Sequence, residues 1–350
     1  MATIYDVVSP EFLATRWEES EQDREPYLLE AWFPESKQMG IELSYLQGNS
    51  PKVRPLDLSA FDVKALPLTR ESFNKITQDM PYWKNFLPIN EKMRQDLLTA
   101  LQTGNQKYLD ILLNRIYNDN KALLDDARVT REMLRALIMT TGVITFASNG
   151  QQIQYDYKVP TENKKTISSE TQKWSASATA DPITDIIGWQ DAVQTATGVR
   201  PTNLLMNRKT FNYIRSATSV KNAIFYLADG KVTPNEQRTK DYVMQETGCT
   251  IYIYDKGYYP QGSSTLTKFV PDNVVSLFPD SAMGEFVFGT TPAEADLMSG
   301  ATNAIVEIVD TGVAITQEKL VDPVYSKLIV SMVGIPTLEK PNQLVIATVA

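Results

Sequence analysis

The sequence predicts an α+β protein organised around one long helix, and three observations support this. No proline interrupts the stretch between Pro88 and Pro160, and its apolar residues recur at steps of three and four, which lays one apolar stripe along a helix. Extended runs precede this stretch, and helices and strands with clear boundary residues follow it. With 350 residues, 43% of them hydrophobic, the chain can bury a full core, and its length favours two domains or one elaborated domain.

Residues 1–38 are expected to form an N-terminal arm with a short helix near Pro10–Arg16. Its expected anchors are Trp17, Trp32 and Phe33, because large aromatic side chains dominate contact energies. An ordinary N-terminal segment packed on its own domain would explain the same residues equally well.

A long two-stranded excursion follows the arm. Residues 41–46 alternate like a strand, 47–51 form a turn, and 52–66 form a second extended run whose alternation slips before Phe61. Such a slip indicates a bulge or a bend. Because an isolated two-stranded ribbon is marginally stable in water, we expect it to pack on something else, such as another subunit.

The next elements lead into the helical stretch. A short helix is expected at residues 69–80, because the following proline would end it. An aromatic loop is expected at 81–88. A helix is expected at 91–101 with Asn90 as its N-cap, and Gly104 separates it from the next helix.

The long helix is predicted over residues 105–141, with Gly142 as its stop. It would measure roughly 55 Å at about 1.5 Å per residue, which is longer than a compact domain needs. A long core helix is the simpler interpretation. The alternative is a spine helix that runs along a flat, extended subunit and supports its other elements. The apolar stripe consists of Leu109, Leu112, Leu113, Ile116, Leu123, Leu124, Ala127, Leu134, Leu137 and Ile138.

After this helix, a hairpin is expected from 143–147 and 152–159, because Asn-Gly between alternating runs is the strongest short hairpin signal. A linker rich in Thr, Ser, Lys and Glu at 161–179 predicts a domain boundary. A helix then opens at Asp181 as N-cap, with proline next, and closes at Gly198. Further helices are expected at 208–217, 220–227 and 236–247, and strands at 203–206, 250–254, 273–278, 304–309, 313–317, 325–333 and 343–349.

The composition excludes several classes of function. The chain has no histidine, which removes Ser-His and Cys-His relays, the imidazole base and the commonest metal ligand. A net charge of −8 and a pI near 4.9 oppose tight binding to a phosphate backbone. The single cysteine, Cys249, permits no intramolecular disulfide, and neither a membrane-spanning apolar run nor a signal-peptide pattern is present. We therefore expect a soluble protein made in a cytoplasm.

The motifs for catalysis are weak or absent. Neither GxGxxG nor GxxxxGK[ST] occurs, and SxxK at Ser72–Lys75 lacks its companion motifs. Asp125-Asp126 lies on the polar side of a helix, and Asp181 with Asp185 is explained by a helix cap. Cys249 has no imidazole partner. All of these residues are therefore interpreted as structural. Four tyrosines also lack the interleaved Lys and Arg of a base-stacking surface; they are Tyr252, Tyr254, Tyr258 and Tyr259. No catalytic, cofactor-binding or metal site is predicted.

Several short motifs, in order, resemble those of one family. Trp174 followed by Asp181–Asp185 (DPITD) resembles a W…DPxxDI pattern, and Phe269–Val275 (FVPDNVV) resembles F-L-P-D-N. Gly284–Gly289 resembles GxxxYG, with Phe288 in place of tyrosine. The ending Asp322-Pro323 with residues 331–336 resembles DP…SxPL, although Val333, Gly334 and Ile335 are extra residues between the serine and the proline. Together these motifs, and the order of the elements, resemble the lambda-type branch of the tailed-phage major capsid proteins, which have the Hong Kong 97 fold.

This resemblance implies a domain organisation. The N-terminal arm would be residues 1–38, and the extended loop with its connector 39–90. The peripheral domain with the spine helix would be 91–173 and 311–335, and the axial α/β domain 174–310 and 336–350. The loop would lie across a neighbouring subunit, which implies inter-subunit contacts at Tyr45, Leu46, Lys52, Arg54 and Leu56.

The resemblance also implies a function and partners. The chain would be a structural, non-enzymatic shell protein that assembles through pentamers and hexamers into the icosahedral head of a tailed bacteriophage, in the host cytoplasm. The shell would enclose double-stranded DNA without sequence-specific binding and without a membrane. Expected partners are a separate scaffolding protein, a portal and a decoration protein where the shell carries one. Lys52 and Lys64 are candidate crosslink donors, although exposed lysines are ordinary surface residues.

Two alternatives remain at this point. An encapsulin-like nanocompartment shell would have the same fold and enclose a cargo enzyme. A histidine-free carboxylate hydrolase would need two carboxylates facing across a cleft at roughly 5 to 9.5 Å.

Overall fold

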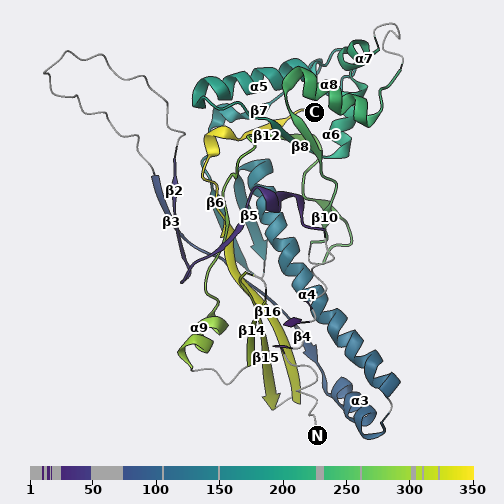
Figure 1. Cartoon of the computed structure of the whole chain (residues 1–350), viewed down its shortest axis with the longest axis vertical. Helices are drawn as coiled ribbons and strands as arrows, with labels where there is room; N and C mark the ends of the chain where they lie inside the picture. Colours follow the sequence, from purple (N-terminus) through teal and green to yellow (C-terminus); the bar gives the residue numbers. More distant parts are fainter. Residues whose placement is uncertain are drawn as a thin grey trace, which may run out of the picture. The chain divides into compact units, whose positions relative to one another are not determined.

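A computed structural model describes most of the chain (Figure 1). The described residues are 10–11, 14–15, 17, 25–48, 74–104, 106–148, 150–225, 232–260, 262–300, 305–309, 311–321 and 324–350. They fall into two compact units. The first unit is built from Met1–Ser44, Thr77–Leu134 and Glu285–Thr337, and the second from Tyr45–Ile76, Arg135–Gly284 and Leu338–Ala350.

The N-terminal segment is anchored by the aromatic residues that the sequence singled out. Trp17, Trp32 and Phe33 are 2%, 6% and 0% exposed, so their predicted burial is confirmed. The described residues between 10 and 17 are helical. A 3-10 turn, η1 (Leu28–Ala31), and a short strand, β1 (Glu35–Lys37), follow.

The two helices at the start of the spine form as the sequence predicts. Helix α3 (Glu91–Gln102) begins where Asn90 Oδ1 accepts a hydrogen bond from the Met93 amide at 3.0 Å. Helix α4 (Gln106–Thr141) has 36 residues and is the long helix in Figure 1. Its first turns bury apolar side chains against α3 and two strands of the first unit. This cluster contains Ile89, Leu97, Ala100, Leu109, Leu112, Ile116, Tyr117 and Leu328.

The first unit contains a six-stranded sheet in the order β1-β13-β16-β15-β14, with β4 paired to β16. The strand β16 (Val324–Pro336) pairs antiparallel with all three of its neighbours. The other strands are β4 (Tyr82–Ile89), β13 (Phe286–Phe288), β14 (Ile305–Val309) and β15 (Val313–Val321), and helix α9 (Pro292–Ser299) lies between β13 and β14 in the chain.

The structure corrects two predictions in this region. The expected aromatic loop at 81–88 is the strand β4, because its backbone pairs with β16 and aromatic residues suit a pleated surface. The expected helix at 69–80 is wrong where it is described, since β3 (Asn74–Asp79) is a strand that pairs with β2 (Glu42–Gln47). Pairing between strands overrides a weak local helical preference. The predicted strand at 41–46 is confirmed as β2, whereas 52–66 lies outside the described residues.

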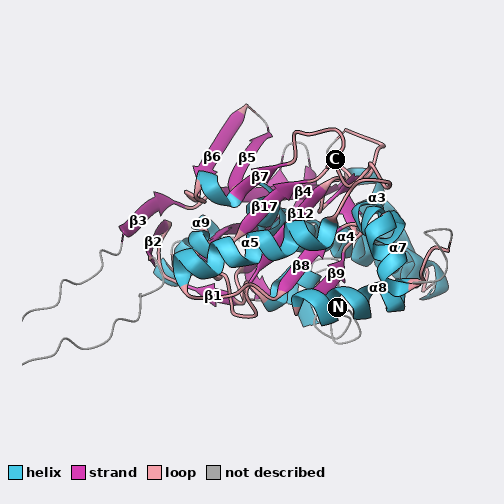
Figure 2. Cartoon of the chain, turned by 90° about the horizontal axis from the view of Figure 1, so that it is seen from above, coloured by secondary structure: helices cyan, strands magenta, loops and turns pink. Residues whose placement is uncertain are grey.

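The second unit contains a five-stranded sheet in the order β7-β17-β12-β8-β9. Side chains from its helices and strands form one buried core that includes Trp174, Trp189, Leu204, Leu277 and Val345, and helices cover the sheet (Figure 2). The elements are α5 (Pro182–Thr197), β8 (Asn203–Met206), α6 (Arg208–Ser216), α7 (Thr218–Ile224), α8 (Glu236–Thr247), β9 (Thr250–Ile253), β12 (Val274–Phe278) and β17 (Val345–Thr348).

The segment expected to be a linker contains regular structure. Residues 161–163 form η2 (Thr161–Asn163), and β7 (Lys164–Thr166) pairs in parallel with β17. The sequence of β7 is polar and gave no strand signal, but its backbone forms the edge strand of the sheet. The predicted hairpin is confirmed as β5 (Val143–Ser148) and β6 (Gln151–Asp156), and a second hairpin joins β10 (Gly257–Tyr258) to β11 (Thr267–Lys268).

Gly142 ends helix α4 in a backbone conformation that favours glycine. Its φ is 71°, and its amide donates to the carbonyl of Ile138 at 2.9 Å. An added Cβ would lie 2.7 Å from Cγ2 of Val159. Both the conformation and the close approach therefore require glycine here.

Replacing Gly142 with alanine should lower the free energy of unfolding by more than the roughly 1–2 kcal/mol that a left-handed residue with a Cβ costs, because a clash with Val159 is added. The matched control is Gly104→Ala, with φ 66° and no atom within 4 Å of the added Cβ. Urea denaturation followed by circular dichroism measures both. Equal losses in the two variants would show that Val159 moves aside without cost.

Candidate functional site

The described part of the chain offers no assembled metal site or membrane span. Within these residues, no group of three or more Cys, Asp and Glu side chains is placed to hold a metal ion. No helix among them is both long and apolar enough to cross a membrane.

Of the five predicted inter-subunit contact residues, two are described. Tyr45 and Leu46 lie in β2, and they point to opposite sides because neighbouring side chains alternate along a strand. The other three, Lys52, Arg54 and Leu56, lie outside the described residues.

Tyr45 and Gln47 attach β2 to their own chain. Nε2 of Gln47 donates to the carbonyl oxygens of Tyr157 at 2.8 Å and Leu338 at 3.3 Å, and the Gln47 side chain is buried. Burial raises the pKa of the Tyr45 hydroxyl to about 12, although a backbone hydrogen bond with Leu338 partly opposes this. Tyr45 thus has an internal anchoring role that the sequence pattern did not indicate.

Leu46 points the other way, and its side chain is 61% exposed. Glu42 and Ser44, which alternate on the same side of β2, are exposed as well. The outer face of β2 therefore offers a carboxylate and an apolar side chain to the surroundings.

The Trp174 and Asp181–Asp185 motif forms a half-buried polar contact in the second unit. Nε1 of Trp174 donates to Oδ2 of Asp185 at 2.9 Å, and the Trp174 ring stacks on Trp189 with centroids 6.0 Å apart. Burial raises the pKa of Asp185, while the Trp174 hydrogen bond lowers it. The carboxylate of Asp181, predicted as the N-cap, accepts from the Thr184 hydroxyl at 2.7 Å and makes no capping bond to the backbone.

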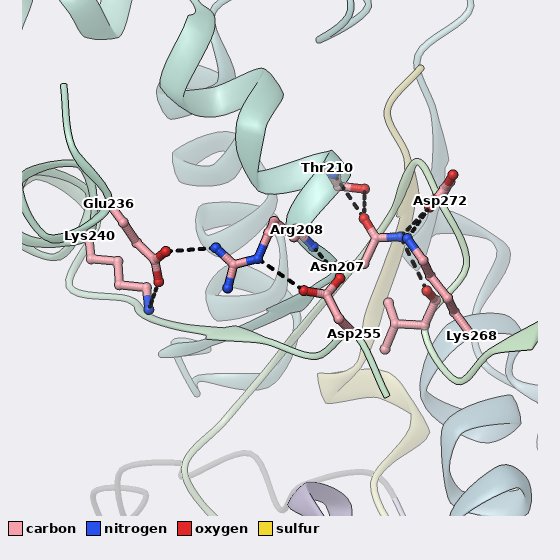
Figure 3. Close-up of polar contacts among 9 residues, drawn as sticks. Asn207, Arg208, Thr210, Glu236, Lys240, Asp255, Lys268 and Asp272 are labelled. Atoms are coloured by element: carbon pink, nitrogen blue, oxygen red, sulfur yellow. Dashed lines mark hydrogen bonds and ion pairs between the residues drawn. The ribbon is translucent and has the colours of Figure 1, made fainter. Parts of the chain in front are cut away.

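The Phe269–Val275 motif is joined to the start of helix α6 through Asn207 (Figure 3). Oδ1 of Asn207 caps α6 by accepting from the Thr210 amide at 2.9 Å, while Nδ2 donates to Oδ1 of Asp272 at 2.6 Å and to the Val270 carbonyl at 3.3 Å. Asn273 has φ 69°, a conformation that asparagine adopts more readily than most residues. Side-chain contacts therefore fix the turn that starts β12.

Charged side chains surround this turn. Nζ of Lys209 and Nζ of Lys268 lie 3.0 and 3.1 Å from the Asp272 carboxylate, and the hydrogen bond from Lys209 is the main cause of the lowered pKa of Asp272. Arg208 contacts Glu236 at 2.8 Å and Asp255 at 3.2 Å (Figure 3). Because these groups are solvated, the pairs contribute little to stability.

The Gly284–Gly289 motif contains β13 in the first unit. The rings of Phe286 and Phe288 are buried with centroids 5.0 Å apart. The Gly289 amide donates to the Val333 carbonyl at 2.9 Å, and an added Cβ would come within 2.6 Å of the Gly40 carbonyl oxygen. The closing glycine of the motif is thus explained by backbone packing.

Polar groups on α4 hold the N-terminal segment in the first unit, which the sequence pattern did not predict. Nη1 of Arg131 lies 2.9 Å from both carboxylate oxygens of Glu35. Oε1 of Glu132, fully buried, accepts from the Leu29 amide at 3.1 Å. The periodic apolar stripe gave no sign of these contacts, because their partners are about 100 residues away in the sequence.

The weaker candidates from the sequence have structural explanations. Cys249 is fully buried, and burial raises the pKa of its thiol. Burial, with a smaller contribution from the neighbouring Asp125, raises the pKa of Asp126. Ser72 lies outside the described residues.

Comparison with known proteins gives a family match over nearly the whole chain. The model of the family described as phage major capsid protein E matches residues 13–349. No curated protein matches the chain.

Solved structures of phage and prophage proteins are similar in fold to this chain. A protein assigned as a prophage capsid protein in E. coli CFT073 has a TM-score of 0.56 at 14% identity, with 97% of each chain covered. A phage-related protein from Bordetella bronchiseptica RB50 has a TM-score of 0.55 at 12% identity, also with 97% of each chain covered. The capsid of cyanophage A-1(L) has a TM-score of 0.50 at 11% identity, with 92% of each chain covered. The predicted α+β class and the predicted resemblance to phage capsid proteins are confirmed.

Replacing Trp174 with phenylalanine should lower the free energy of unfolding at pH 7 by about 1.5–3 kcal/mol, since the Asp185 carboxylate loses its donor. The raised pKa of Asp185 means that its contribution to stability is greatest below the ordinary aspartate value and falls as the pH rises. The variant raises this pKa further, so its loss should shrink between pH 7 and pH 4. Urea denaturation at both values tests this, and in an Asp185→Asn background the pH dependence of the loss should disappear. A dependence that persists there would assign it to another group.

Replacing Asn207 with alanine should cost about 2–4 kcal/mol, because a buried cap and a hydrogen bond to a carboxylate are lost together. The matched control is Asn235→Ala, which removes only the cap of α8 and should cost about 1 kcal/mol. Thermal and urea denaturation give both values. Similar losses would show that the contact with Asp272 contributes nothing beyond the cap.

Proposed function

The chain belongs to the phage major capsid protein E family, and from this premise we propose that it assembles through pentamers and hexamers into the icosahedral shell of a tailed phage. The family places it in the virion capsid, in a shell of many subunits. The observation that carries the proposal is the family match over residues 13–349. The family match favours it over a cargo-enclosing nanocompartment, and the capsid structures of similar fold favour it over a carboxylate hydrolase.

We assign a structural role without catalysis. The family is one of structural capsid proteins, and the candidate catalytic carboxylates Asp181 and Asp185 are hydrogen-bonded to Thr184 and Trp174. These contacts support a role for both carboxylates in holding the fold.

The shell would enclose double-stranded DNA without binding its sequence. A net charge of −8 supports this role, because an acidic subunit does not displace the counterions of a phosphate backbone. Assembly would take place in the host cytoplasm, with a separate scaffolding protein, a portal and a decoration protein where the shell carries one.

The domain assignment keeps the boundaries drawn from the sequence. We propose an arm at 1–38, an extended loop with its connector at 39–90, a peripheral domain at 91–173 with 311–335, and an axial domain at 174–310 with 336–350. Helix α4 and the strands β15 and β16 support the peripheral assignment, and the sheet of β8, β12 and β17 supports the axial one. Residues 285–310 belong to the first compact unit and residues 135–173 to the second, so the boundaries near 173 and 310 are the ones that the structure of an assembled shell would test.

The extended loop would lie across a neighbouring subunit. The exposed Leu46 on β2 supports this role, whereas Tyr45 would act indirectly by holding β2 in place. Lys52, Arg54 and Leu56 remain predicted contacts.

Sedimentation and negative-stain electron microscopy of the purified protein, alone and with a scaffold candidate from the same genome, test the function. Rings, sheets, tubes or closed shells are the expected species, and dependence on the scaffold would favour a virus over a nanocompartment. A homogeneous small species under both conditions would contradict the proposal.

Deleting Tyr45–Leu58 should leave a soluble, folded subunit that cannot close shells, because the loop would no longer reach a neighbour. Circular dichroism checks the fold, and electron microscopy checks the assembly. Normal shells from the deletion variant would remove the role assigned to the loop.

A further inference from the structure

The strand β4 has one edge that is paired and one that is not. Its register with β16 aligns Trp83 with Met332 and Leu87 with Leu328. Among the described residues, no strand pairs with the other edge of β4. An unpaired strand edge offers a row of backbone donors and acceptors on which another strand can pair.

The ladder with β16 decides which backbone groups of β4 face the free edge. The Gly334 amide donates to the Pro81 carbonyl at 3.3 Å. Because bonded pairs alternate along an antiparallel ladder, the odd-numbered residues of β4 exchange hydrogen bonds with β16, and the even-numbered residues from 82 to 88 point to the free edge. Pro88 fits this assignment, since a proline within a sheet lies where its nitrogen faces away from the ladder.

Both faces of β4 are open beside this edge. Phe86 and Tyr82 on one face are 53% and 43% exposed, and Leu87 on the other face is 37% exposed. Leu87 shares its face with Leu328, which is buried in the apolar cluster with α3 and α4. The apolar face of the sheet thus continues onto β4 without the cover that it has at β16, which marks a contact surface.

The sequence of β4 is suited to pairing with itself. In an antiparallel pair of two β4 strands centred on Asn85, each Lys84 lies opposite Phe86 of the second copy, and each Tyr82 lies opposite Pro88. The amides of Lys84 and Phe86 then donate to each other's carbonyls, and the Tyr82 amide donates to the carbonyl of Pro88. Every amide at the free edge of β4 has an acceptor in this register.

Side chains favour the same register. Nζ of Lys84 lies 5.4 Å from the ring centroid of Tyr82 in its own strand, and the pairing brings the ring of Phe86 from the second copy to its other side, which suits an ammonium group. On the opposite face, Trp83 and Leu87 of the two copies lie across from each other. Such aromatic and apolar cross-strand pairs stabilise a sheet.

The neighbouring registers are less favourable. A shift by one residue in one direction centres the pair on Lys84 and sets two ammonium groups directly opposite each other, which is destabilising. The opposite shift centres the pair on Phe86 and sets the Tyr82 amide opposite Asn90, beyond the end of β4. The Asn90 carbonyl already accepts from the Arg94 amide at 3.1 Å.

We propose that the free edge of β4 pairs antiparallel with β4 of a second copy of this chain, with Asn85 of both copies at the two-fold axis. The contact is isologous and therefore closes at two copies, while Lys84 and Pro88 oppose pairing with other strands through charge and a missing amide. Its place as a two-fold contact within the shell rests on the proposed function. The pairing itself rests on the strand edge.

Disulfide trapping with a single substitution tests the pairing. In full-length Asn85→Cys protein, the two introduced thiols would face each other in a non-hydrogen-bonded pair, where Cα atoms lie about 4.5 Å apart, within the range that a disulfide spans. Oxidation followed by a non-reducing gel should give a linked dimer. Cys249 is fully buried, so the background from the native thiol is small.

The matched control is Leu87→Cys on the same strand. Its thiol would lie four residues along the strand from its counterpart, roughly 13 Å at about 3.3 Å per residue, so it should give little linked dimer. Equal yields from the two variants would overturn the pairing. Absence of a linked dimer from Asn85→Cys would overturn it as well and would leave the edge to a strand of another protein.

The same samples separate this inference from the proposed function, because oxidation is carried out on whatever species sedimentation finds. Shells without a linked dimer would overturn the pairing and keep the function. A linked dimer from protein that never forms shells would keep the pairing and remove the function.

Removing one backbone donor gives an independent readout. Phe86→Pro deletes an amide that faces the free edge and leaves the ladder with β16 intact, whereas Phe86→Ala removes the same ring and keeps the amide. In the Asn85→Cys background, the proline variant should give about tenfold less linked dimer than the alanine variant, because a hydrogen bond is lost on each side of the axis. Their unfolding midpoints should be alike. Equal yields of linked dimer would contradict the pairing.

Discussion

The first unit depends on the backbone pairing of one strand. The thirteen residues of β16 are paired with β15 along one side and with β4 and β13 along the other. An unpaired backbone donor or acceptor inside the unit would cost about as much as a lost hydrogen bond, so β16 requires partners along its length. Those partners come from residues 82–89, 286–288 and 313–321, which brings strands from the first and last thirds of the chain into one sheet.

Helix α4 packs into an apolar core with some residues and binds the N-terminal segment with others. Its first turns bury Leu109, Leu112 and Ile116 in an apolar cluster, whereas Arg131 and Glu132 hold the N-terminal segment. Removing one member of such a buried polar pair costs more than the pair contributes, because the remaining group stays buried without its partner. The helix therefore binds a segment far away in the sequence as well as its own core.

Strand β2 has one face attached to its own chain and one exposed face. Its alternation directs Tyr45 and Gln47 inward and Glu42 and Leu46 outward. A shell subunit needs both properties, because a contact surface that is mobile in the free subunit must be ordered at the expense of binding energy. In the contact that we propose for the extended loop, internal anchoring of β2 would reduce that cost.

The sequence alone determined the elements whose signals are local. Asn90, Gly142 and Gly198 mark helix ends through their own backbone preferences, and the alternation and Asn-Gly turn define the β5–β6 hairpin. It also excluded histidine chemistry and carried the motifs of the family. Only the tertiary structure decided that 82–89 and 164–166 are strands, that Tyr45 faces inward and that Trp174 binds Asp185. These features depend on pairing and burial between residues far apart in the sequence, where local periodicity carries no information.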